Sequence, residues 1–82
     1  MYRTIPSVKD EEFEHIVDAR KSAIRYLEKT GSWESVEIKE RKRGVEGTVY
    51  RAKDPPTGRY EWMFMTVKGH EHRLNRDGSF KE

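Results

Sequence analysis

The sequence predicts a small α+β domain in which one N-terminal amphipathic helix packs on one face of an antiparallel meander of three or four strands. Three observations support this fold class. Apolar residues recur at helical spacing early in the chain, strand-forming segments fill the rest, and glycine or proline separates one segment from the next. A chain of 82 residues has room for one modest core. We therefore expect residues 1–82 to form a single domain, with flexible ends at residues 1–6 and 76–82.

Composition limits the classes of protein to which the chain can belong. Only 33% of the residues are hydrophobic and 39% are charged, but the charges nearly cancel at a net +2, so we expect a folded domain with a thin core. The absence of cysteine excludes disulfides and thiolate metal sites. No apolar run approaches the roughly 20 residues of a membrane span, and the first residues lack the apolar stretch of a signal peptide. We expect a cytoplasmic protein without a membrane partner.

The spacing of apolar residues predicts a helix over about residues 8–30. Ser7 offers a capping hydroxyl, the acids that follow it suit a helix N-terminus, and Gly31 is a natural left-handed stop. Arg20 interrupts the apolar stripe, and we expect its head to lie in water at the margin. The stripe consists of Phe13, Ile16, Val17, Ala23, Ile24 and Leu27.

Strand chemistry fills the remainder of the chain. The predicted strands are Trp33–Arg43, Thr48–Lys53, Arg59–Lys68 and a short His72–Asn75. The turns between them are expected at Gly44–Gly47, at Asp54–Gly58 and at Gly69-His70. These turns set a register in which the opposed pairs are Arg43 with Thr48, Lys53 with Arg59, and Lys68 with Glu71. Opposite charges then align across three strands at Glu40, Arg51 and Glu61.

Alternation along the strands sorts the side chains onto two faces. The first face is aliphatic and suits the helix; it holds Val36, Ile38, Val49, Met63, Met65, Val67 and Leu74. The second face is aromatic and basic; it holds Lys39, Arg41, Tyr50, Ala52, Tyr60, Trp62 and Phe64. The residues expected to be mostly buried between helix and sheet are Ile16, Val17, Ile24, Leu27, Ile38 and Met65.

The aromatic and basic face predicts a small accessory nucleic-acid-binding protein. Unpaired bases stack on aromatic rings, and neighbouring cations neutralise phosphates, so single-stranded RNA or DNA is the expected partner. The basic excess lies in residues 36–82, which carry eleven Lys or Arg and eight Asp or Glu. The alternative is a protein-interaction module, an inhibitor or adaptor that uses the same face for a partner or a second copy. The expected binding residues are Lys39, Arg41, Arg43, Tyr50, Tyr60, Trp62 and Phe64.

Catalysis and metal binding have less support. His70 and His72 flank Glu71, but these are too few ligands to specify a metal site. A histidine beside Arg73 and near Lys68 leaves a small ribonuclease as a third reading. No nucleophile motif, acid pair or phosphate-binding glycine loop accompanies it. We therefore expect no enzyme activity, no catalytic residue, no metal and no cofactor.

The predicted order of helix and three strands resembles double-stranded-RNA-binding domains and small toxin ribonucleases. The resemblance is one of topology alone, and both families normally have a second helix. It carries no functional residue to this chain.

Overall fold

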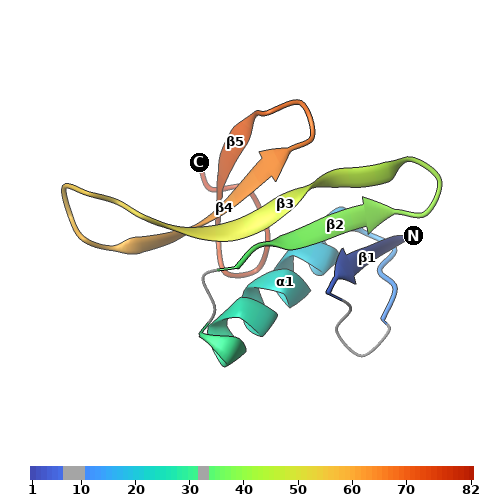
Figure 1. The fold of residues 1–82 in the computed structure, drawn as a ribbon, viewed down its shortest axis with the longest axis horizontal. Coiled ribbons are helices and arrows are strands. Elements are labelled where there is room, and N and C mark those ends of the chain that lie inside the picture. The colour runs from blue at the N-terminus through green and yellow to red at the C-terminus, as the bar shows by residue number, and fades with distance from the viewer. Residues whose placement is uncertain (7–10, 32–33) are drawn as a thin grey trace.

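The computed structural model describes residues 1–6, 11–31 and 34–82. Within these residues, one helix lies against one face of a five-stranded antiparallel sheet whose strands follow one another in chain order (Figure 1). The α+β class is confirmed, but the helix is in the middle of the chain and a further strand precedes it. In the same residues, no helix is long and apolar enough to cross a bilayer. The elements are β1 (Tyr2–Ile5), α1 (Ile16–Thr30), β2 (Val36–Glu40), β3 (Gly44–Lys53), β4 (Tyr60–Thr66) and β5 (Glu71–Leu74).

The amino terminus, expected to be flexible, forms the edge strand β1. It pairs antiparallel with β2, and Thr4, opposite Ile38, is only 2% exposed. On the other edge of β1, Tyr2 and Phe13 exchange two backbone hydrogen bonds of 2.7 Å. This pairing places Phe13 in a β-bridge, so the predicted helix start near residue 8 is wrong and α1 begins at Ile16. The predicted cap at residues 7–10 lies outside the described residues.

The end of the helix agrees with the prediction. Gly31 is left-handed, with a φ of 65°, and donates its N–H to the carbonyl oxygen of Leu27 at 3.0 Å. The apolar side of α1 packs on the sheet to form the core. The buried apolar residues are Ala19, Ala23, Ile24, Leu27, Val36, Ile38, Val49, Phe64 and Leu74.

The core prediction holds only in part. Ile24, Leu27 and Ile38 are fully buried as expected, whereas Ile16 and Val17 near the start of α1 are half-buried. Met65 is 36% exposed, so its predicted burial is wrong. Its position follows from the register of the strands.

The hairpin between β2 and β3 turns earlier than predicted. Glu40 lies opposite Gly44, so the turn consists of Arg41, Lys42 and Arg43. The Glu40 carboxylate accepts the backbone N–H groups of Lys42 at 2.6 Å and Arg43 at 2.7 Å, and Gly44 supplies the left-handed residue that closes the turn, with a φ of 82°. The predicted turn at Gly44–Gly47 is therefore wrong.

Gly47 serves packing instead. It lies inside β3, opposite Ile38, and a Cβ at this position would come within 2.4 Å of the Phe64 ring. Because Gly47 has no side chain, the Phe64 ring can lie close to the backbone of β3. The prediction of Gly47 as a turn residue does not account for this contact.

The other two hairpins also differ in register. Lys53 pairs with Tyr60 rather than Arg59, and Met65 pairs with Glu71 rather than Leu74. Both shifts are by an odd number of residues, and such a shift moves every side chain of a strand to the other face of the sheet. The predicted alignment of Glu40, Arg51 and Glu61 is consequently wrong: Arg51 lies opposite Trp62.

The carboxy-terminal tail, which was expected to be flexible, turns back onto the helix. Lys81 donates its backbone N–H to the carbonyl oxygen of Arg73 at 2.8 Å. Arg20 on the helix is 7% exposed and donates its Nε–H to the carbonyl oxygen of Gly78 at 2.7 Å. The expectation that the head of Arg20 lies in water is therefore wrong. Its guanidinium lies 5.2 Å from the ring centroid of Phe64 and 4.5 Å from that of Phe80.

Candidate nucleic-acid interface

The structure distributes the predicted binding residues over four places. The prediction of a single aromatic and basic face is therefore wrong. Phe64 lies in the core and is 2% exposed. It pairs with Val49 and therefore faces the helix, which removes it from any surface on which a base could stack. The remaining residues are Lys39 and Tyr50 on the face opposite the helix, Arg41 and Arg43 in the β2–β3 turn, and Tyr60 and Trp62 near the β3–β4 loop.

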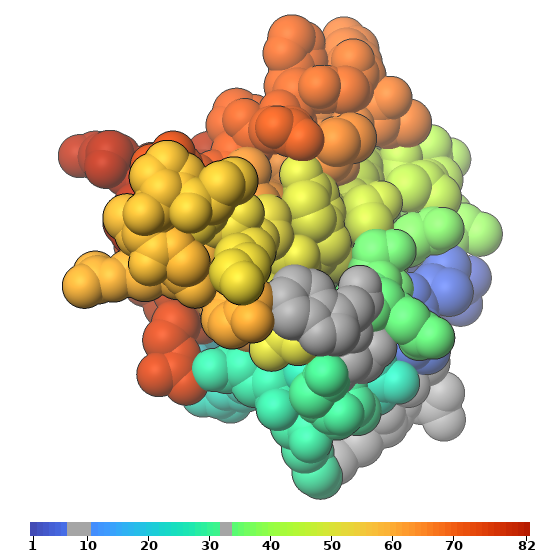
Figure 2. Space-filling model, turned by 60° about the vertical axis from the view of Figure 1, so that its left-hand side comes forward, coloured from blue at the N-terminus to red at the C-terminus, as the bar shows by residue number. Residues whose placement is uncertain are grey.

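Tyr60 and Trp62 belong to a hairpin arm, residues 51–62, that projects from the body of the domain (Figures 1 and 2). Lys53 lies directly opposite Tyr60, and Arg51 directly opposite Trp62. Residues two apart on a strand and residues directly opposite each other share a face. The four side chains therefore form one surface, here called the arm patch, on the helix side of the sheet.

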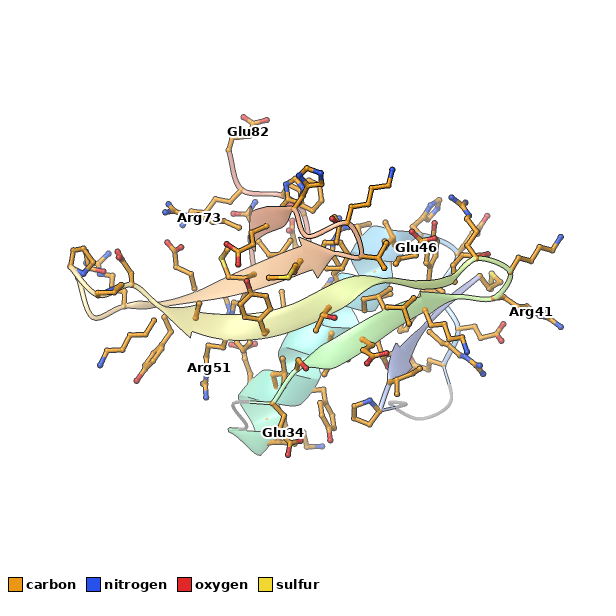
Figure 3. All side chains as sticks on the ribbon, turned by 45° about the horizontal axis from the view of Figure 1, so that its top comes forward. Glu34, Arg41, Glu46, Arg51, Arg73 and Glu82 are labelled. Carbon is orange, nitrogen blue, oxygen red and sulfur yellow. The ribbon has the colours of Figure 1, made fainter. Side chains whose placement is uncertain are left out.

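The arm patch combines aromatic rings with positive charge. The Arg51 guanidinium lies 5.3 Å from the ring centroid of Tyr60 and 5.9 Å from that of Trp62. Its Nη2 donates to the carbonyl oxygen of Gly31 at 3.3 Å, which places the patch at the end of the helix (Figure 3 labels Arg51). The Tyr60 side of the patch is open, since that residue is 53% exposed. This geometry offers aromatic surface beside a fixed cation.

The sequence prediction missed Arg51 and Lys53. The error was one residue in the length of the β3–β4 loop, which runs from residue 54 to 59 rather than 54 to 58. The loop closes with a backbone hydrogen bond of 2.8 Å from Asp54 to Arg59, one residue beyond the glycine that suggested the turn. With the longer loop, alternation alone would have placed both cations beside Tyr60 and Trp62.

The β2–β3 turn forms a second cationic region, here called the basic turn. Arg41, Lys42 and Arg43 are all exposed in it. The predicted strand Trp33–Arg43 extends too far to include Arg41 and Arg43, because β2 ends at Glu40. Backbone N–H groups from Arg43 and then Lys42 hold the pKa of the Glu40 carboxyl below its ordinary value, so this carboxylate stays charged while it binds the turn.

Lys39 and Tyr50 lie on the side of the sheet that faces away from the helix, here called the open face. Within the described residues, both α1 and the tail pack on the opposite side (Figure 1). The Tyr50 hydroxyl donates to Glu71 Oε1 at 2.9 Å. Partial burial, together with this carboxylate, raises the pKa of Tyr50 to about 12. The open face thus holds one predicted aromatic residue and one predicted cation, separated from the arm patch by the thickness of the sheet.

His70 and His72 lie in different surroundings in the described part of the chain. His72 stacks on Phe80 with ring centroids 4.3 Å apart, and His70 lies exposed in the β4–β5 turn. Among the residues that the structure describes, no group of three His, Cys, Asp or Glu side chains is placed to hold a metal ion.

Comparisons with protein-family models, curated proteins and solved structures gave no match, so the function is argued from this chain alone.

Proposed function

We propose that this domain binds single-stranded nucleic acid through the arm patch. The observation that carries the proposal is the grouping of Tyr60 and Trp62 with Arg51 and Lys53 on one face of a projecting hairpin. The two rings are two residues apart on one strand, which spaces them by about 7 Å. Tyr60 is exposed and offers the main stacking position, whereas Trp62 is partly buried and packs against the core beside it. Stacking tolerates any base, because every base has a π-face.

Charge supports the same partner. Lys53 and Arg59 are exposed on the arm, and both can reach phosphates on a strand whose bases stack on the rings. Glu61, the nearest acid on β4, lies on the other face, where its Oε2 is 3.2 Å from Nε of Arg73. Glu61 therefore does not lie beside the cations of the arm patch. The basic turn would add sequence-independent attraction over a longer ligand.

Binding to a labelled single-stranded oligonucleotide, measured by fluorescence anisotropy at low salt, tests the proposal. Separate RNA and DNA oligonucleotides distinguish the two ligands. Tyr60→Ala should weaken binding by about 1–3 kcal/mol, the usual loss when one stacking ring is removed. Because Tyr60 is 53% exposed, the fold should survive the change. Tyr60→Phe is the matched control: it keeps the ring and should bind like the parent protein.

The salt dependence tests the phosphate contacts separately. Lys53→Gln and Arg59→Gln should each lower the slope of log affinity against log salt by about one, since each removes one neutralised phosphate. Lys68→Gln changes an exposed lysine at the opposite end of β4 and should leave the slope unchanged. Absence of binding at low salt, or equal affinities for the parent and Tyr60→Ala, would refute the proposal.

A further inference from the structure

The solvent-facing side of α1 carries a stripe of positive charge. Lys21, Arg25 and Lys29, here called the helix stripe, follow one another at intervals of four residues and therefore lie on one side of the helix. Arg25 and Lys29 are exposed, and Lys21 is half-buried. Like charges at this spacing disfavour a helix, so the helix stripe does not serve the stability of α1.

The acid closest in sequence to the exposed part of the stripe is engaged elsewhere. Glu28 follows Arg25 by three residues, a spacing that would suit an ion pair within the helix. Instead its Oε2 lies 2.5 Å from Nη2 of Arg76 on the carboxy-terminal tail. Among the residues that the structure describes, neither Arg25 nor Lys29 forms an ion pair. Both charges are therefore available to an anionic ligand.

The two ends of the helix stripe differ in their surroundings. Lys21, at the N-terminal end, lies close to Asp77 on the tail: hydrogen bonds from Ser79 lower the pKa of that carboxyl most, and the charge of Lys21 lowers it further. Beyond Lys21, acids line the groove beside the helix. They are Glu11, Glu12, Glu14 and Asp18. Phosphates are repelled at this end, so an anionic strand that follows the helix leaves it near Lys21.

The C-terminal end of the helix stripe adjoins the arm patch. Arg51 of the patch donates its Nη2–H to the carbonyl oxygen of Gly31 at 3.3 Å, and Lys29 is in the last turn of α1, two residues before Gly31. Arg25 lies about 6 Å further along the helix axis. Positive charge thus continues from the cations beside Tyr60 onto the outer side of the helix.

We propose that the single strand bound at the arm patch continues along the helix stripe, with its phosphates beside Lys29 and Arg25. The extended site rests on the proposed binding at the arm patch. It divides the work between two elements, since the arm offers an aromatic ring for a base and the helix offers charge for the backbone. A strand too short to leave the arm therefore gains nothing from the helix.

Oligonucleotides of two lengths, about four and about twelve nucleotides, test this extension by fluorescence anisotropy. Arg25→Gln with Lys29→Gln should bind the shorter strand like the parent. On the longer strand the same variant should lower the slope of log affinity against log salt by about 1–2 and weaken binding by roughly tenfold at about 0.1 M salt, because two phosphates are no longer neutralised. Its Tm should be no lower than that of the parent, since like-charged neighbours on the helix are removed.

Lys39→Gln with Lys68→Gln is the matched control. It removes the same charge from the open face and from the β4–β5 turn, and it should leave the salt slope of the longer strand unchanged. Equal slopes for the helix-stripe variant and the parent, an equal loss in the control, or weaker binding of the shorter strand by the helix-stripe variant would each overturn the extension. Binding that depends on Tyr60 would then remain at the arm alone. A parent that binds neither strand would overturn the extension and the proposed function together.

Discussion

Replacing Arg20 with methionine should destabilise the domain by about 2 kcal/mol. The estimate starts from the hydrogen bond to the Gly78 carbonyl oxygen at 2.7 Å and from the two ring contacts with Phe64 and Phe80. A hydrogen bond from a charged donor contributes about 1.5–3 kcal/mol, and a cation over a ring about 0.5–1 kcal/mol. Burial lowers the pKa of Arg20, a sign of the desolvation cost that offsets part of this sum. Methionine keeps the apolar stem packed.

Thermal unfolding followed by circular dichroism measures this loss. For a domain of this size, about 2 kcal/mol corresponds to a fall in Tm of roughly 8–16 °C. Hydrogen exchange should also quicken at the backbone amide of Lys81, because the tail loses its attachment to the helix. Arg25→Met is the control, since Arg25 is exposed on the same helix and its loss should change stability by less than about 0.5 kcal/mol. Equal Tm values for Arg20→Met and the parent would refute the role assigned to Arg20.

Three further predictions concern the core and two ionisable groups. Leu27→Ala should cost about 2–5 kcal/mol in urea unfolding, because Leu27 is fully buried; an unchanged midpoint would contradict the packing. Glu40→Gln should be less stable than the parent at neutral pH. Because the folded pKa is lowered, that difference should shrink as the pH falls below the ordinary value of 4.5, and a difference that grows in acid would contradict the turn. Tyr50 should ionise near pH 12 rather than 10 in an ultraviolet titration, and the stability that its raised pKa contributes should be lost between these values. Tyr50→Phe should remove this transition from the titration.

The sequence predicted the features of the fold that depend on local periodicity and on turn residues. Helical spacing located most of α1, and Gly31 marked its end, because a left-handed glycine is a local signal. Strand chemistry and turn residues located β2 to β5 to within a few residues. The early helix start was wrong because Phe13 pairs with Tyr2, eleven positions earlier in the chain, and such a contact leaves no local pattern.

The candidate site was harder to predict because register decides it. Gly47 looked like a turn residue, yet it is required by the ring of Phe64 on the neighbouring strand. The turn itself depends on the carboxylate of Glu40, whose capping role cannot be read from a glycine pattern. The predicted register was wrong by an odd number of residues in two hairpins. The prediction therefore placed the methionines of β4 on the helix side of the sheet, where the aromatic residues of β4 lie. Tyr60 and Trp62 were correctly expected to lie together, but their cationic neighbours are Arg51 and Lys53.

Mapping of amide chemical shifts during titration with a short single-stranded oligonucleotide tests the proposed function most directly. Shift changes should concentrate in the arm, at residues 51–53 and 59–62, with smaller changes at the basic turn and little change at Tyr50 or Met65. The changes should diminish as salt is raised, because phosphate neutralisation releases counterions. Shift changes confined to the open face, or none at low salt, would contradict the assignment of the arm patch as a nucleic-acid interface.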